Sequence, residues 1–257
     1  SPWMQKLPGG LIHVNVVGCA LFAAISGSSA ATVATVGKMS IPELRKRKYP
    51  EKILLGSLAG SGTLGLLIPP SIILIIYGVT VQESIAKLFI AGIIPGIMIA
   101  LIFMSYVIIW SLINKKSMPK YVENFSFLEK IRKSKQLLPV IILISAVIGS
   151  IYTGVATATE AASLGVVGAL ILSYFQKSLT IETFKQSLLG ATKTSCMIAF
   201  ILAGSTFLSL AMGFTGLPRN LAIWIQNMEL SPYVLIFVLM IFYIILGMFL
   251  DGISAVV

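Results

Sequence analysis

Long uncharged stretches, separated by short charged segments, dominate the chain. They cover residues 7–37, 53–82, 88–113, 136–159, 161–176, 194–218 and 230–250. A helix needs about 20 apolar residues to cross a bilayer, so most of these stretches fit one crossing each. We therefore expect an all-α polytopic membrane protein, with a transmembrane helix over 88–113, a helix pair over 137–176 and a transmembrane helix over 188–213.

Two stretches do not fit a simple crossing. A single helix over 7–37 would be about 46 Å long, whereas the hydrocarbon core is about 30 Å thick. The polar run Ser26-Gly27-Ser28-Ser29 lies beyond its middle, which predicts a re-entrant helical hairpin that enters and leaves on one face. The stretch 53–82 contains Gly60-Ser61-Gly62-Thr63-Leu64-Gly65 and then Pro69-Pro70, which predicts a transmembrane helix broken into two halves.

The composition excludes several classes of protein. Of the 257 residues, 57% are hydrophobic and 11% are charged, whereas soluble domains carry about 25% charged residues. A soluble enzyme, a secreted disulfide scaffold and a disordered chain are therefore excluded. The net charge of +10 would suit a nucleic-acid partner, but the basic residues lie between apolar stretches, so we expect none. Cys19 and Cys196 lie in separate apolar stretches and are expected to be free thiols.

The basic residues predict the orientation. Most of the 19 Lys and Arg residues lie in the three loops 38–52, 114–135 and 177–187. Two crossings separate each loop from the next, and the positive-inside rule places all three in the cytoplasm. The hairpin over 7–37 then enters from the cytoplasm.

A short internal repeat agrees with this topology. Ile25-Ser26-Gly27-Ser28-Ser29-Ala30 aligns with Leu250-Asp251-Gly252-Ile253-Ser254-Ala255, and a long apolar run precedes each. The two breaks are approached from opposite faces, which is typical of secondary transporters with inverted repeats.

Breaks of this kind can bind ions, because they free carbonyls and hydroxyls inside the membrane. Pro69 and Pro70 have no amide hydrogen for the carbonyls of Gly65 and Leu66, and the following half-helix is expected to start at Pro69-Pro70-Ser71. We predict a cation site formed by Ser26, Ser28, Ser29, Gly60, Gly62 and Thr63. The predicted substrate-binding residues, beside the N-terminus of that half-helix, are Ser28, Pro69, Pro70 and Ser71. Asp251 is assigned to a second cation site or to a helix cap. A helix kink in a packed bundle is the alternative interpretation of the Pro-Pro break.

The sequence contains few other residues or motifs that indicate catalysis, metal binding or nucleotide binding. Glu160 either serves a function within the membrane or caps a helix that begins after Thr157 or Thr159, and we favour the cap. His13 is the only histidine, which argues against a transition-metal site. The sequence has no phosphate-binding Gly-Lys-Ser/Thr loop and no evident nucleophile–base pair. We therefore expect neither ATP-driven transport within this chain nor an enzyme.

Several ordered motifs resemble the large membrane subunit (DctM-like) of tripartite ATP-independent periplasmic (TRAP) transporters. They are Gly9-Gly10-Leu11, Ile25 to Ala31, Gly60 to Ser71, Ile93-Ile94-Pro95-Gly96, Thr157 to Ala162 and Leu246 to Asp251. The resemblance implies an elevator-type, sodium-coupled importer in a bacterial inner membrane. It also implies that 9–38 is the first re-entrant hairpin, 53–78 the first broken helix and 231–257 the start of a second hairpin. Family members extend beyond both ends of this sequence, so we expect a fragment of a longer chain.

The resemblance also implies partners and a substrate. The partners are a small four-helix membrane subunit, separate or fused, and a periplasmic substrate-binding protein. The substrate is a carboxylate of the C4-dicarboxylate or sialic acid type, and Na⁺ is the coupling ion. Two alternatives are a stand-alone ion-coupled carboxylate transporter of a related inverted-repeat fold and, from another class, an ion channel. Sodium-independent uptake without accumulation would indicate a channel.

Overall fold

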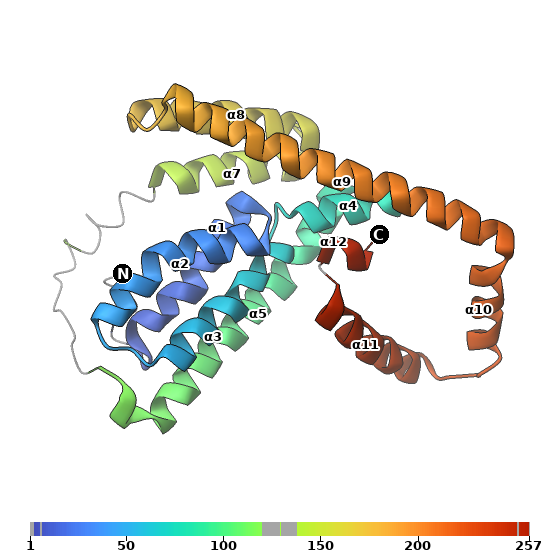
Figure 1. Cartoon of the computed structure of the whole chain (residues 1–257), viewed down its shortest axis with the longest axis horizontal. Helices are drawn as coiled ribbons and strands as arrows, with labels where there is room; N and C mark the ends of the chain where they lie inside the picture. The colour runs from blue at the N-terminus through green and yellow to red at the C-terminus, as the bar shows by residue number, and fades with distance from the viewer. Residues whose placement is uncertain (1–2, 6, 120–128, 130–137, 251, 257) are drawn as a thin grey trace. The chain divides into compact units, whose positions relative to one another are not determined.

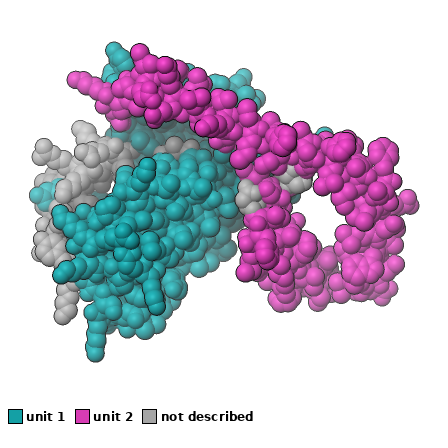
Figure 2. All heavy atoms as spheres, viewed as in Figure 1, with its two compact units in different colours: residues 1–175 teal, residues 176–257 magenta. Residues whose placement is uncertain are grey.

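The computed structural model describes residues 3–5, 7–119, 129, 138–250 and 252–256. All regular secondary structure in these residues is helical, which confirms the expected all-α class. The chain divides into two compact units, residues 1–175 and 176–257, coloured separately in Figure 2. Each unit is described by itself.

Figure 1 labels the helices. The first unit contains η1 (Gly10–Ile12), α1 (His13–Ser26), α2 (Ser29–Lys46), α3 (Glu51–Gly62), η2 (Thr63–Leu66), α4 (Ile72–Thr80), α5 (Ile85–Ile113), η3 (Lys115–Ser117), α7 (Leu138–Tyr152) and α8 (Ala158–Phe175). The second unit contains α9 (Ile181–Thr215), α10 (Leu217–Gln226), α11 (Pro232–Phe249) and α12 (Gly252–Val256).

Four of the described helices, α5, α8, α9 and α11, are long and apolar enough to cross a membrane. This agrees with a polytopic membrane protein. Helix α9 has 35 residues and extends beyond the predicted crossing 188–213 at both ends. The predicted pair 137–176 corresponds to α7 and α8, which are separated at 153–157.

Within the polar run 26–29, Gly27 and Ser28 separate α1 from α2, and these two helices pack against each other. Gly27 ends α1 with a φ of 58°, and its N–H donates to the carbonyl of Ala23 at 2.9 Å. Glycine is favoured there because a side chain is strained in this left-handed conformation. Ser28 is extended and begins α2 as its N-cap, with Oγ accepting from the amide of Ala31 at 3.4 Å. The range 9–38 therefore forms a helical hairpin, and α2 continues for about two helical turns beyond residue 38. That the hairpin enters and leaves the membrane on the same face stays a prediction.

The predicted broken helix, 53–78, corresponds to three elements, α3, η2 and α4. The second half begins at Ile72, not at Pro69-Pro70-Ser71, so the expected start was wrong. Helical backbone angles are disfavoured for a residue that precedes a proline, and Pro69 precedes Pro70. Ser71 is extended, with φ −116° and ψ 135°, and forms the N-cap.

Helix α1 packs against α2, α3, α5 and η2. Its buried residues include Val16, Cys19 and Ala23. Polar contacts also join it to α3: fully buried Asn15 donates from Nδ2 to the carbonyl of Leu54 at 3.1 Å and to Ser57 Oγ at 3.0 Å. Inside a membrane, such bonds hold helices together where hydrophobic attraction between them is weak.

Asn15→Ala is expected to destabilise the contact between α1 and α3. Two hydrogen bonds are lost, each worth about 1 kcal/mol, for a total of about 1–2 kcal/mol. Thermal unfolding of the complete transporter in detergent measures the loss as a lower midpoint. Asn114→Ala is the matched control, because Asn114 Nδ2 donates within its own helical turn, to the Trp110 carbonyl at 3.0 Å. Equal midpoints for the two variants would contradict the prediction.

Glu160 forms the cap at the start of α8. Its Oε2 accepts from both the amide and the hydroxyl of Thr157, each at 2.8 Å, while its own amide donates to Thr157 Oγ1 at 3.3 Å. This reciprocal arrangement is a capping box. It supports the structural interpretation of Glu160.

The second unit leaves its apolar surface open. Helices α9, α10 and α11 contain no buried residue. Within the predicted range 231–257, α11 ends at Phe249, Leu250 is extended and α12 starts at Gly252. Asp251, assigned to a second cation site or a cap, lies outside the described residues.

Candidate functional site

The tip of the α1–α2 hairpin lies against the break between α3 and α4. A Cβ placed on Gly65 of η2 would be 3.2 Å from the carbonyl carbon and oxygen of Ser28 and 3.3 Å from the amide nitrogen of Ser29. The missing side chain of Gly65 therefore lets two backbones touch. The sequence motif contained Gly65, but nothing local to it indicated this contact.

The other side of the tip contacts the start of α4. A Cβ on Gly27 would be 3.1 Å from the amide nitrogen of Ile72 and 3.3 Å from the carbonyl oxygen of Pro70. The turn between α1 and α2 therefore lies at the N-terminus of α4. The N-termini of α2 and α4 carry partial positive charge from their first-turn N–H groups, and the C-terminus of α1, which ends in this turn, carries partial negative charge.

Hydrogen bonds hold the tip in this shape. Thr32 is fully buried, and its hydroxyl donates to the carbonyl of Ser28 at 2.7 Å and lies 2.8 Å from Ser26 Oγ. The amide of Ser28 donates to Ser26 Oγ at 3.3 Å. Sequence reasoning missed Thr32; its position one helical turn after Ser28 is the signal that could have indicated it.

The structure brings together four of the six residues predicted for the cation site. Ser26, Ser28 and Ser29 form the tip, and Gly62 is next to it, because a Cβ on Gly62 would be 3.6 Å from the Ser29 carbonyl oxygen. A Cβ on Gly62 would also collide with Val33 of α2. The end of α3 therefore fits closely against the first turn of α2.

The other two predicted residues lie differently. The Cα of Gly60 faces Phe103 of α5, whose ring would be 3.4 Å from an added Cβ. Thr63 is exposed, and its hydroxyl donates to the Gly60 carbonyl at 2.7 Å. The Thr63 hydroxyl is therefore engaged within its own turn.

The Pro-Pro segment shows one correction to the predicted substrate site. The Leu66 carbonyl, expected to be available because Pro70 has no amide hydrogen, accepts the Ser71 hydroxyl at 2.7 Å. Ser71 is fully buried and makes no side-chain cap on α4. Its hydroxyl hydrogen is therefore not available to a ligand, whereas the first amides of α4 are uncapped.

The chemistry of this site comes from hydroxyls, carbonyls and helix ends. The described residues contain no group of three or more His, Cys, Asp and Glu side chains that could hold a metal ion. Neutral oxygens with no acid cluster suit a monovalent cation better than Ca²⁺.

Comparison with known proteins agrees with the motifs. Residues 4–257 match the family model of the tripartite ATP-independent periplasmic transporter, DctM component. The C4-dicarboxylate TRAP transporter large permease protein DctM of Pseudomonas aeruginosa is 34% identical over 244 residues, covering 95% of this chain and 56% of that protein.

Two further relatives differ in their named substrates. The isethionate TRAP transporter permease protein DctMQ of Oleidesulfovibrio alaskensis is 31% identical, covering 99% of this chain and 40% of that protein. The sialic acid TRAP transporter large permease protein SiaM of Vibrio cholerae is 32% identical, covering 96% of this chain and 58% of that protein. The chain thus spans about half the length of these relatives, which are transport proteins and not enzymes.

The family model matches nearly the whole chain, and the hairpin and broken helix of the structure carry the motifs that first indicated the resemblance. The chain therefore belongs to the DctM component family of tripartite ATP-independent periplasmic transporters.

Proposed function

We propose that this chain forms part of a sodium-coupled secondary importer of a small organic acid in a bacterial inner membrane. A periplasmic binding protein would deliver the substrate, and a small four-helix membrane subunit, separate or fused, would complete the membrane complex. The observation that carries the proposal is the hairpin tip lying against the helix break, where Ser28 contacts Gly65 and Gly27 contacts the start of α4 at Ile72.

The tip supplies the sodium site in this proposal. Ser26, Ser28 and Ser29 and the end of α3 at Gly62 contribute hydroxyl and carbonyl oxygens at one place. Hard oxygen ligands suit a small cation, and backbone groups freed by a helix break are a recurrent source of them in transporters. Asp251 is assigned to a second cation site or a cap.

The first amides of α4 supply the anion site. The substrate carboxylate would lie at the uncapped N-terminus before Ile72, beside Ser28 and the backbone of Pro69, Pro70 and Ser71. A bound Na⁺ and a helix N-terminus both favour negative charge, so the two ligands should bind cooperatively. The named substrates of the relatives, C4-dicarboxylate, isethionate and sialic acid, limit the proposal to organic acids.

Calorimetry on the complete complex tests the coupling. Sodium is expected to tighten substrate binding by roughly 5- to 150-fold, corresponding to about 1–3 kcal/mol, and substrate to tighten sodium binding by the same factor. Ser29→Ala should weaken sodium binding and reduce this factor. Substrate affinity independent of sodium would overturn the coupled mechanism.

Dependence on the binding protein is tested separately. Uptake of an organic-acid panel into proteoliposomes is expected only when the periplasmic protein and a sodium gradient are both present. Equal uptake without the periplasmic protein would indicate a stand-alone transporter. Sodium-independent uptake without accumulation would indicate a channel.

A further inference from the structure

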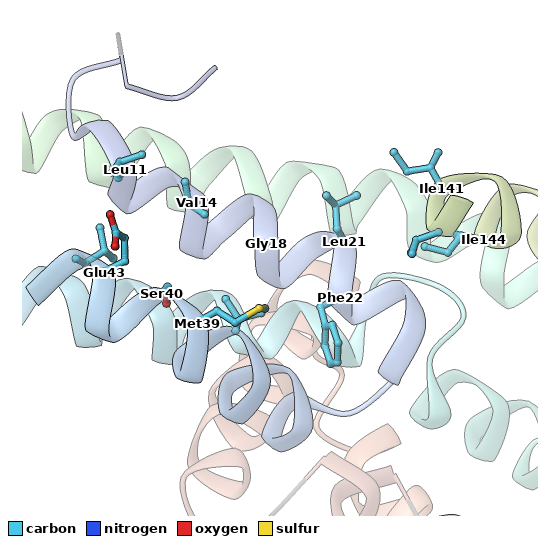
Figure 3. A pocket seen from close by; sticks show the side chains of 13 residues that line it. Leu11, Val14, Gly18, Leu21, Phe22, Met39, Ser40, Glu43, Ile141 and Ile144 are labelled. Carbon is cyan, nitrogen blue, oxygen red and sulfur yellow. The ribbon is translucent and has the colours of Figure 1, made fainter. Parts of the chain in front are cut away.

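An apolar groove with a volume of about 510 Å³ runs along α1 and α2 in the first unit, with α7 contributing part of the wall. Figure 3 shows Leu11 and Glu43 toward one end and Phe22 and Ile144 toward the other. Gly18 lies between them on α1. The groove is separate from the hairpin tip, and nothing in the proposed transport mechanism uses it.

The length of the groove matches one leaflet of a bilayer. From Leu11 to Phe22 the chain rises about 16 Å at 1.5 Å per residue, and half of the hydrocarbon core is about 15 Å. The Glu43 end leads directly into the basic segment Arg45 to Lys48, which the positive-inside rule places in the cytoplasm. The groove therefore extends from the cytoplasmic surface toward the middle of the membrane.

The groove is polar only toward its cytoplasmic end. Ser40 lines it and is 8% exposed, and its Oγ has no hydrogen-bond partner in the described part of the chain. The hydroxyls of Ser111 and Ser150, by contrast, each donate to a carbonyl of their own helix at 2.8 Å. The Ser40 Oγ atom itself has almost no accessible surface, so Ser40 adds polarity to the wall at this end rather than a contact with a ligand.

The charge at this end is net positive. Glu43 Oε1 lies 2.6 Å from Arg47 Nε, and the hydrogen bond from Arg47 holds the pKa of Glu43 below its ordinary value. Lys46 also lowers the pKa of Glu43 and adds a second positive charge. The carboxylate of Glu43 and the cations Lys46 and Arg47 together leave a net positive charge, which favours an anionic ligand group.

The groove is lined mostly by apolar side chains, and its volume of about 510 Å³ leaves room for an extended hydrocarbon chain.

We propose that the groove binds one acyl chain of an anionic phospholipid from the cytoplasmic leaflet. The phosphate lies beside Arg47 and Lys46. Burial of acyl CH₂ groups would supply most of the affinity, at about 0.8 kcal/mol each, while the cations select the headgroup.

Retained lipid can be counted by native mass spectrometry of the complete transporter complex. The complex is equilibrated in vesicles of equal parts phosphatidylglycerol and phosphatidylcholine with identical acyl chains and then extracted in mild detergent. Phosphatidylglycerol is expected to be retained at least about fivefold over phosphatidylcholine. Equal retention of the two lipids would overturn the anionic assignment.

Gly18→Leu tests the groove itself. An added Cβ at Gly18 makes an ordinary contact with Val36, 3.5 Å away, and Gly18 lines the groove, so a leucine side chain is expected to occupy it. Retained lipid should fall by one molecule per chain. Gly56→Leu is the matched control, because a Cβ on Gly56 meets nothing within 4 Å. Equal lipid counts for the two variants, the result if a protein segment covers the groove in the complex, would overturn the proposal.

The double variant Lys46→Gln/Arg47→Gln tests the headgroup site. It should remove the preference for phosphatidylglycerol while the total count of retained lipid stays close to that of the unaltered protein. Lys115→Gln/Lys116→Gln makes the same charge change in η3, outside the groove, and should keep the preference. A preference unchanged by the first pair would show that these cations do not hold the headgroup.

Discussion

Replacing Gly65 by valine is expected to reduce sodium-driven uptake by the complete transporter by roughly 5- to 150-fold, the equivalent of an overpacking cost of about 1–3 kcal/mol. A Cβ at this position would be 3.2 Å from the backbone of Ser28. Backbone atoms cannot rotate away as a flexible side chain can. The two methyl groups of valine would therefore push the hairpin tip out of the helix break and separate the cation ligands from the start of α4.

Proteoliposome uptake measured across a range of sodium concentrations checks this prediction. Gly65→Ala should cause an intermediate loss of uptake, because the backbone atoms of Ser28 and Ser29 need to move by only a few tenths of an ångström. Gly56→Val is the control, since the same side chain enters open space there. Wild-type uptake by Gly65→Val would mean that contact between tip and break is not required for transport.

Thr32→Val is expected to raise the sodium concentration for half-maximal uptake by about tenfold. Valine keeps the shape of threonine but removes the hydroxyl that bonds to the Ser28 carbonyl and to Ser26 Oγ. Each such bond is worth about 1 kcal/mol net, and 1.4 kcal/mol corresponds to a factor of ten. The tip would lose the bonds that hold its oxygens in place.

Thr32→Ser restores the hydroxyl and should restore the sodium dependence, which a purely steric role for Thr32 would not predict. Thr80→Val is the control, because the Thr80 hydroxyl bonds within α4 to the Ile76 carbonyl at 2.9 Å, away from the tip. Identical sodium dependence of Thr32→Val and Thr80→Val would show that the hydroxyl of Thr32 does not organise a cation site.

Local sequence features predicted the class of protein and the positions of the breaks. Apolar stretches of crossing length indicated a helical membrane protein, and the runs at 26–29 and 60–70 marked where α1 and α3 end. These features act over a few residues: hydropathy decides which segments enter the bilayer, and glycine and proline decide which backbone angles are accessible. The ordered motifs indicated the family, which the match over residues 4–257 confirms.

The arrangement of the site depended on contacts between segments that are distant in the sequence. The contact between the hairpin tip at Ser28 and Gly65 joins residues nearly forty positions apart. The bond from Ser71 to the Leu66 carbonyl exists because Ser71 is extended before α4, and it occupies an oxygen that the missing proline amide had freed.

The sequence by itself determined that this protein is a helical membrane protein of the DctM component family with helix breaks at known positions. Only the tertiary structure decided which hydroxyls and carbonyls meet at those breaks, that Thr32 supports the tip, and that an apolar groove lies along α1 and α2. The physical reason is one of range. Hydropathy and backbone sterics are properties of each segment alone, whereas hydrogen bonds and grooves depend on the distances between segments that packing brings together.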